Sequence, residues 1–292
     1  MKLGGPSLIV DTFSQRALGY GTGSSGGSIT PPLDSVSSDL GMAYSIGRRL
    51  LTSYTGPLIR VRVDNEFQSE EDIPYVEETG LLDLDYLLNF AGSDACYVCK
   101  AYGQVGGRNW QQTTAAAQPL IVEAGGGVQT DEYGRVSSVV THTTNLVHSG
   151  TNQTSIFGSS SSLIVMRMKQ ISPFSGLNRV LYNGTADLLC YAAFGSTIYW
   201  DYGNGSAANN RVNAAQPTGW ANAYHWLRLS RHADVQKIHV DGTELVSATR
   251  TAALPSTSAF LYAPLDLTGC FSECVAWTSG DNAAAKEAAL MA

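Results

Sequence analysis

Residues 226–246, WLRLSRHADVQKIHVDGTELV, decide the fold of this chain. Two runs within them, residues 226–230 and 237–240, are candidate short strands. Asp241-Gly242 follows the second run, and Asp-Gly is a favoured sequence for the tight turn of a β-hairpin. The stretch therefore predicts antiparallel strands joined by short turns.

The rest of the C-terminal half continues this pattern. Turn sequences such as Asn183-Gly184 and Gly203-Asn204-Gly205 separate short apolar runs. We expect strands at residues 161–168, 180–182, 188–194, 197–200, 259–262 and 270–277. Such even spacing is typical of a two-sheet sandwich, and the alanine-rich residues 282–291 predict a terminal helix.

The first 40 residues have too few apolar side chains for a compact domain. A Gly/Ser-rich run covers residues 19–28, and Pro31-Pro32 follow it. Such a segment is either a flexible linker or an extended arm that becomes ordered against a neighbouring subunit. In the second interpretation, the candidate assembly residues are Leu8, Ile9, Val10 and Phe13.

Residues 41–130 predict a mixture of strands and short helices. Apolar residues between 43 and 51 recur at helical spacing behind Asp39, which is a good N-cap, and Arg48-Arg49 would lie on the solvated face of that helix. The other elements expected in this segment are a strand at 58–63, a solvated acidic loop at 66–78, an amphipathic helix at 83–90, strands at 95–100 and 120–123, and a turn at 124–127.

The 292 residues fit one large β domain or two smaller ones. We divide them into an arm (1–40), the mixed segment (41–130) and a sandwich (131–292). A net charge of −7 argues against a nucleic-acid partner. The sequence lacks both a run of roughly 18 apolar residues for membrane insertion and the apolar region of a secretory signal. With five cysteines, an odd number, these features predict synthesis in a cytoplasm.

Two stretches, in the right order, resemble concanavalin-like (laminin-G-like) jelly rolls. The first is the strand, turn and return strand of residues 226–246. The second is GCFSECVAW at residues 269–277, which resembles the closing strand of those domains. The resemblance covers about residues 140–292. It implies an all-β protein, a concanavalin-like antiparallel β-sandwich (jelly roll) with a few short helices and an extended N-terminal arm.

The N-terminal half carries a second resemblance. Residues 43–62 read AYSIGRRLLTSYTGPLIRVR, and residues 103–109 read GQVGGRN. They resemble the catalytic domain of arabinofuranosidase B-type enzymes and their phage-encoded relatives, which look like virion proteins. The resemblance implies a phage virion structural protein in a tail, fibre, neck or capsid decoration, located in the virion. Its expected partners are other virion proteins, copies of itself (as in a homotrimer) and host surface carbohydrate.

The catalytic residues of the resembled enzymes are not recognised in this sequence. A retaining glycosidase needs two carboxylic acids about 5–5.5 Å apart. The resemblance places the nucleophilic glutamate at the end of a DYGNAE motif, but residues 201–206 read DYGNGS and put Ser206 there. Residues 181–184 also supply no acid, the vicinal cysteine pair is absent, and Gly103 replaces an expected aspartate. We therefore expect a non-catalytic protein; the alternative is a glycoside hydrolase of arabinofuranosidase type.

An aromatic stretch offers residues for sugar binding. Sugar sites combine aromatic platforms with amide and carboxylate hydrogen bonds. The alternative is that Trp200 and Trp226 lie in the sandwich core while Tyr202 caps the sheet. The candidate carbohydrate-binding residues are Tyr199, Trp200, Asp201, Tyr202, Asn204, Asn209, Arg211 and Trp220.

We expect no cofactor and no metal site. Cys96 and Cys99 have zinc-ligand spacing, but residues i and i+3 of a strand point to opposite faces. Cys270 and Cys274 are expected to share a face and to pack in the core. His225 is expected to be a strand residue rather than a ligand. Calcium is the open alternative, with loop candidates Asp187, Asp201, Asp234 and Asp241.

Overall fold

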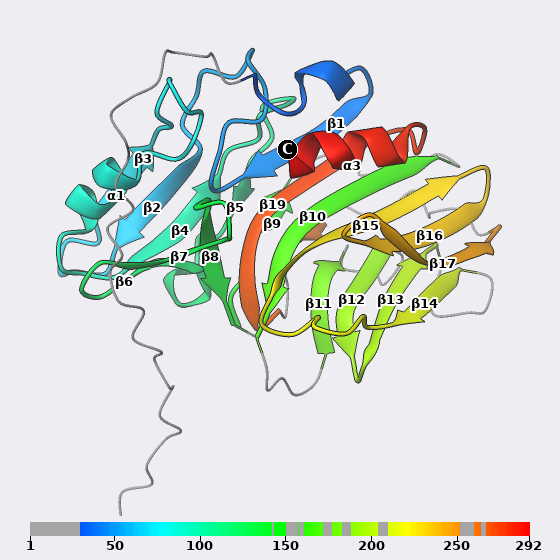
Figure 1. Ribbon diagram of the computed structural model, residues 1–292. Helices are drawn as coiled ribbons and strands as arrows, with labels where there is room; N and C mark the ends of the chain where they lie inside the picture. The colour runs from blue at the N-terminus through cyan, green and yellow to red at the C-terminus, as the bar shows by residue number, and fades with distance from the viewer. Residues whose placement is uncertain are drawn as a thin grey trace, which may run out of the picture.

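A computed structural model describes residues 30–141, 143–149, 157, 161–171, 177–182, 188–203, 210–251, 260–263 and 267–292. Over these residues antiparallel strands dominate, and the helices are few and short (Figure 1). The predicted fold class, an all-β antiparallel sandwich, is confirmed. The assembly-arm candidates Leu8, Ile9, Val10 and Phe13 lie outside the described residues.

The first layer contains the stretch that decides the fold. Residues 226–246 fall in three consecutive antiparallel strands, and Asp241 and Gly242 turn between the last two with φ of 49° and 79°. These are the left-handed values that the predicted hairpin requires. The order across the layer is β1 (Leu40–Ser45), β19 (Gly269–Trp277), β10 (Ser162–Gln170), β15 (Tyr224–His232), β16 (Val235–Val240) and β17 (Thr243–Thr249).

The second layer is longer and is assembled from both halves of the chain. Its order is β14 (Arg211–Ala215), β13 (Thr197–Tyr202), β12 (Leu188–Phe194), β11 (Leu177–Tyr182), β18 (Phe260–Tyr262), β9 (Val147–Ser149), β5 (Trp110–Gln111), β4 (Cys96–Ala101), β2 (Ile59–Val63) and β3 (Glu70–Ile73). Because β18 and β9 join the two groups of strands, pairing crosses from the sandwich into the mixed segment. The boundary expected at residue 130, between the mixed segment and the sandwich, remains a prediction.

Three further strands link the layers. They are β6 (Leu120–Glu123), β7 (Gly127–Thr130) and β8 (Val136–Val140). β6 pairs with β4 of the second layer, and β8 pairs with both β6 and β19 of the first. Hydrogen bonds therefore run from one layer to the other without a break.

The main core lies between the layers. Ile164 and Leu229 from the first layer pack in one cluster with Ile198 and Trp200 from the second. Alternation along each strand places these side chains inward. Burying a large apolar side chain contributes roughly 1.5–3 kcal/mol, so this interior is the main source of stability.

A second cluster lies on the other face of the first layer. The helix α3 (Ala283–Met291) and the 3-10 turn η1 (Asp34–Val36) cover that face, as Figure 1 shows for α3. Leu290 packs with Val275 and Trp277, and the Trp277 indole N–H donates to the Val36 carbonyl at 2.8 Å. The predicted terminal helix is therefore confirmed, and it seals the outside of β19 and β10.

The remaining helix was also predicted from the sequence. α1 (Leu84–Ala91) begins at Asp83, whose carboxylate accepts the Tyr86 backbone N–H at 2.9 Å. Gly92, with φ of 60°, ends it. A short 3-10 turn, η2 (Ala115–Ala117), completes the elements of the described residues.

The helix expected at residues 43–51 is wrong. Residues 40–45 form β1, in which Ala43 pairs with Val275, and four consecutive residues of the strand are buried. A strand buried on both faces is a continuous apolar run, which periodicity alone does not separate from a helix. Arg48 therefore does not lie on a solvated helix face but is buried.

Candidate functional site

Three of the predicted sugar-binding aromatics lie in the core. Trp200 is 0% exposed, and Tyr202 and Trp220 are also buried. β13 alternates, so Trp200 and Tyr202 point between the layers. These three side chains therefore present no platform to a ligand, and the core interpretation of Trp200 holds. Asn204 and Asn209 lie outside the described residues.

The other predicted residues lie together on the opposite face of the same strands. Arg211 binds Asp201 through two bonds of 2.6 Å and lies 4.8 Å above the Tyr199 ring. The hydrogen bond to Asp201 is the main cause that raises the pKa of Arg211. Phe194, 52% exposed, and Tyr191 both pack edge-on against Tyr199, at 5.8 and 6.3 Å. We call Tyr191, Phe194, Tyr199, Asp201 and Arg211 the aromatic face.

The sequence prediction missed Tyr191 and Phe194. Pairing between β12 and β13 places Tyr191 opposite Tyr199, and a register shift between Tyr191 and Phe194 brings Phe194 to the same rings. No local sequence pattern indicates that shift. The Arg211 guanidinium, held by the buried Asp201, packs against the Tyr199 ring. An ordered aromatic surface edged by this guanidinium suits a sugar, which has an apolar ring face and polar edges.

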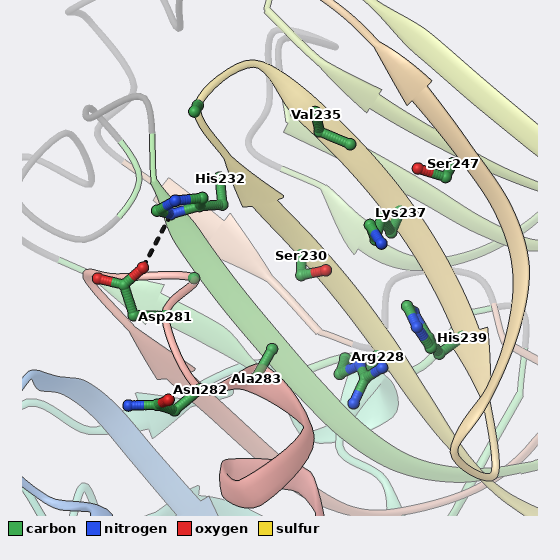
Figure 2. Close-up of a pocket in the computed structure, with 12 residues that line it drawn as sticks. Arg228, Ser230, His232, Val235, Lys237, His239, Ser247, Asp281, Asn282 and Ala283 are labelled. Atoms are coloured by element: carbon green, nitrogen blue, oxygen red, sulfur yellow. Dashed lines mark ion pairs between the residues drawn. The ribbon is translucent and has the colours of Figure 1, made fainter.

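A hollow lies elsewhere, beside the start of α3 (Figure 2). Its volume is about 530 Å³. Strands β15 and β16 supply Arg228, Lys237 and His239, and the loop before α3 supplies Asp281. In Figure 2 the strand residues line one side of the hollow and residues 281–283 the other.

Each charge in this hollow has a partner of opposite sign. Arg228 bonds the buried Glu287, Lys237 bonds Glu244 at 2.7 Å, and His232 lies 2.9 Å from Asp281. Burial raises the pKa of Glu287, and it lowers the pKa of His239 to about 4 with help from the charge of Arg228. His239 is therefore neutral at physiological pH, and the hollow is a polar but charge-compensated surface.

The other histidine considered from the sequence has a structural role. The His225 ring stacks on Trp220 at 4.8 Å and lies between Asp241 (2.6 Å) and the Gly219 carbonyl (3.2 Å). Asp241 also accepts the Trp226 backbone N–H at 2.8 Å. This arrangement fastens the β16–β17 turn to the start of β15.

Four buried carboxylates are bound by arginine. Asp131 is bound by Arg135 at 2.8 Å and Glu273 by Arg48 at 2.8 Å. Asp201 and Glu287 have the partners already described. A buried carboxylate with an arginine partner stabilises the fold only while the pair is intact, so we assign these four to structure rather than to chemistry.

Within the residues that the structure describes, no group of three His, Cys, Asp or Glu side chains could hold a metal ion. Of the calcium candidates, Asp201 binds Arg211 and Asp234 binds Arg231, while Asp187 lies outside the described residues. None of the described helices is both long and apolar enough to cross a membrane.

The expectation that Cys270 and Cys274 share a face is wrong. A β-bulge at Ser272 separates them, because Arg167 pairs with Glu273 while Met168 pairs with Phe271. The bulge turns Cys274 into the main core and Cys270 to the other face. All five cysteines are buried and unbridged, and burial raises the pKa of both thiols.

No protein-family model and no curated protein matches the chain. A GH54 α-L-arabinofuranosidase soaked with a cyclic sulfate inhibitor matches its fold with a TM-score of 0.63 at 13% identity, over 90% of this chain and 64% of that one. An arabinofuranosidase complexed with arabinofuranosyl-α-1,2-xylobiose gives 0.62 at 13% identity, over 89% and 64%. A GH54 variant soaked with 4-nitrophenyl α-L-arabinofuranoside gives 0.61 at 13% identity, over 90% and 64%. This chain shares their fold.

This likeness corrects two interpretations of the sequence. The matching folds are those of arabinofuranosidases rather than virion components, so the phage structural protein is overturned. The same matches contradict the non-catalytic interpretation, because they are to the folds of enzymes. Ser206, which stands where the resemblance places the nucleophile, lies outside the described residues. Self-association, including a trimer, and a glycan partner stay predictions.

Proposed function

We propose that this chain is a glycoside hydrolase of the arabinofuranosidase type, acting on α-L-arabinofuranosides. The observation that carries the proposal is the match of 90% of the chain to the fold of enzymes whose structures hold an arabinofuranoside or an inhibitor. The chain spans 64% of the length of those enzymes. The proposal therefore concerns the β-sandwich itself.

The aromatic face supports a saccharide as the ligand. Phe194 and Tyr199 offer ring surfaces, while Asp201 and Arg211 hold each other in a fixed orientation at 2.6 Å. Sugars bind through contact of their C–H faces with aromatic rings and through hydrogen bonds at their edges. We propose that this face contacts the glycan that carries the arabinofuranosyl group.

The chemistry requires two carboxylic acids about 5–5.5 Å apart, one as nucleophile and one as acid/base. Asp131, Asp201, Glu273 and Glu287 are occupied by arginines. The proposal therefore places the reacting pair among the other aspartates and glutamates of the chain.

The proposal is tested without assuming which residue reacts. The purified chain is incubated with 4-nitrophenyl α-L-arabinofuranoside, and the release of 4-nitrophenol is measured. In parallel, a cyclic sulfate inhibitor is added, and the labelled peptide is identified by mass spectrometry. We expect release of nitrophenol and one labelled Asp or Glu, whose amide variant loses activity by about 10³-fold or more. A folded chain that gives neither nitrophenol nor an adduct would contradict the proposal.

A further inference from the structure

Three arginines line a second pocket, which we call the arginine pocket. Arg48, Arg49 and Arg135 line it together with Thr79 and Tyr133, and its volume is about 290 Å³. Among its described lining residues there is no aspartate or glutamate side chain. A guanidinium stays charged at any physiological pH, so the wall presents three cations, whose carboxylate partners Glu273, Glu77 and Asp131 lie outside the lining. Ala292, the last residue of the sequence, also lines the pocket.

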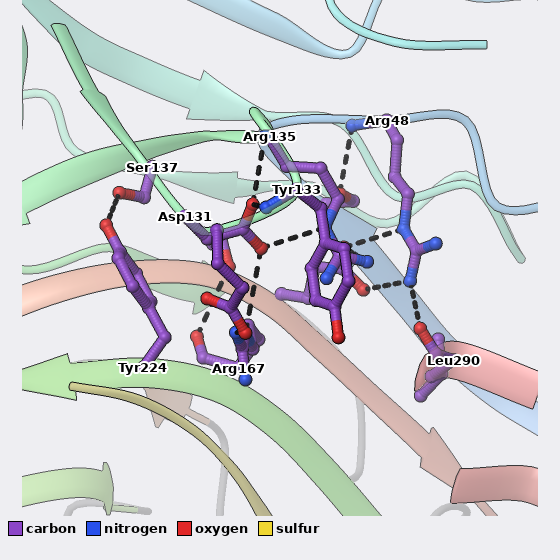
Figure 3. Close-up of polar contacts among 12 residues, drawn as sticks. Arg48, Asp131, Tyr133, Arg135, Ser137, Arg167, Tyr224 and Leu290 are labelled. Carbon is purple, nitrogen blue, oxygen red and sulfur yellow. Dashed lines mark hydrogen bonds and ion pairs between the residues drawn. The ribbon is translucent and has the colours of Figure 1, made fainter. Parts of the chain in front are cut away.

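Buried acids behind the wall hold two of these arginines in place. Arg48 donates to both carboxylate oxygens of Glu273, at 2.8 and 3.2 Å, and also to the Leu290 carbonyl. Arg135 donates to Asp131 at 2.8 Å and lies 4.0 Å from Glu273. Figure 3 shows Arg48, Tyr133 and Arg135 within this network. The guanidinium groups are therefore positioned before any ligand arrives.

Two guanidinium nitrogens still have open hydrogen-bonding capacity. Arg135 Nη2 and Arg49 Nε are buried and have no partner among the described residues, and the Arg135 side chain is only 5% exposed. Nη1 of Arg49 donates to Tyr75 at 2.9 Å and to Glu77 at 3.2 Å. Because buried donors are nearly always satisfied by protein groups or by ordered water, Arg135 Nη2 and Arg49 Nε have hydrogen-bonding capacity left for a water molecule or a ligand.

The chemistry of the wall selects a carboxylate. A guanidinium binds a carboxylate through paired, charge-assisted hydrogen bonds. Tyr133 adds an aromatic surface, because its ring is 60% exposed and lies 4.6 Å from the Arg135 guanidinium carbon. A volume of about 290 Å³ is at the small end of ligand pockets and has room for about one sugar ring.

We propose that the arginine pocket binds the carboxylate of a uronate sugar, with the sugar ring against Tyr133. The carboxylate is argued from the arginines alone, whereas the choice of a sugar rests on the proposed function. A hydrolase with this pocket would favour arabinofuranosides on a glycan that also carries uronates.

Calorimetric titration of the full chain with glucuronate, glucose and succinate tests the ligand class. We expect glucuronate to bind at least tenfold more tightly than either, and its affinity to fall as salt is added. If glucuronate binds no more tightly than glucose, the pocket is not a carboxylate site. If succinate binds as tightly as glucuronate, the pocket does not select a sugar.

Two variants test the location. Arg49→Gln removes one cation of the pocket, and Tyr133→Ala removes the exposed ring; we expect each to weaken glucuronate binding at least fivefold. The matched control is Arg60→Gln, which also breaks an arginine–carboxylate pair, with Asp72 at 2.7 Å, but lies outside the pocket. If both pocket variants bind glucuronate like the parent, or if Arg60→Gln weakens it equally, the assignment is wrong.

The assay separates this inference from the proposed function. Binding of glucuronate is read by calorimetry and needs no hydrolysis. Glucuronate binding by a chain that releases no nitrophenol and forms no adduct would contradict the hydrolase alone. Release of nitrophenol without glucuronate binding would contradict the arginine pocket alone.

Discussion

The protonation of His225 is coupled to the stability of the fold. Burial lowers its pKa, but the hydrogen bond and charge of Asp241 and the Gly219 carbonyl outweigh burial and raise it overall. Burial raises the pKa of Asp241, and the His225 and Trp226 bonds lower it overall. A histidine whose pKa is raised on folding stabilises the protein fully below its unfolded pKa of about 6.5, and this contribution is lost as pH rises through the folded value.

We therefore expect His225→Gln to destabilise the chain in a pH-dependent way. At pH 5.5 the variant should lose about 1–2 kcal/mol of unfolding free energy relative to the parent, because a charge-assisted bond is lost. At pH 8.5 the difference should be smaller. Urea unfolding at both pH values measures it. His232→Gln is the control, since the His232–Asp281 pair is exposed; a His225→Gln difference that grows with pH would contradict the assignment.

Phe194 is the most exposed residue of the aromatic face, and its removal tests that surface. Phe194→Ala should reduce the affinity for an arabinoxylan oligosaccharide about two- to tenfold, because one aromatic contact contributes about 0.5–1.5 kcal/mol. Its unfolding free energy should change by less than about 0.5 kcal/mol. Phe67→Ala is the matched control, since Phe67 is 76% exposed and lies away from the aromatic face. Titration calorimetry decides, and equal affinities for the two variants would remove the role of Phe194.

At the scale of elements, the bulge in β19 determines what each face of the strand carries. Ser272 is the extra residue, its carbonyl accepts the Ile46 N–H at 2.8 Å, and its hydroxyl donates to the Arg167 carbonyl at 3.4 Å. If Ser272 were paired as a regular residue of the strand, alternation would place Glu273 on the face that Cys274 now occupies. A one-residue change of register exchanges the two faces of a strand.

Deletion of Ser272 should therefore keep both faces of β19, because it removes only the extra residue. Phe271 and Glu273 would then take consecutive positions opposite Met168 and Arg167, with Glu273 still directed toward Arg48. We expect a cooperative unfolding transition, measured by circular dichroism, with a loss of about 1–2 kcal/mol from the two hydrogen bonds of Ser272. Ser272→Ala removes only the hydroxyl bond and should lose about 1 kcal/mol or less. A deletion variant without a cooperative transition would contradict the assignment of Ser272 as the extra residue.

At the scale of the whole molecule, Glu273 connects distant parts of the chain. Glu273 lies on β19 and binds Arg48, which follows β1 in the sequence. It also faces Arg135, the residue that precedes β8. Arg48 in turn donates to the Leu290 carbonyl of α3. Removing one partner of a buried ion pair leaves the other charge without compensation. This network therefore couples the outer helix to the first layer.

Glu273→Gln should destabilise the chain by about 3–5 kcal/mol. The loss should appear as one shifted transition in urea, monitored by tryptophan fluorescence, because the connected segments unfold together. Glu77→Gln is the matched control, since Glu77 pairs with Arg49 but its side chain is 71% exposed; it should change stability by less than about 0.5 kcal/mol. Similar losses in the two variants would contradict a special role for the network.

Local patterns determined much of the architecture. The short apolar runs at residues 188–194 and 120–123 predicted β12 and β6 with the bounds that the structure has, and Asp241-Gly242 marked a true hairpin. The amphipathic pattern of residues 83–90 and the alanine-rich end predicted α1 and α3. These features depend on neighbours in the sequence, so they could be predicted from the sequence.

Other features were decided by tertiary structure alone. Pairing with β19 made a strand of residues 40–45 despite their helical spacing, and the Ser272 bulge separated two cysteines four residues apart. The burial of Trp200 and the meeting of Arg49 with Arg135 likewise depend on packing between segments far apart in the chain. Residues 226–246 by themselves determined that the chain forms antiparallel strands joined by tight turns. Which faces it presents depended on register and long-range pairing, because these are set by contacts that no local pattern encodes.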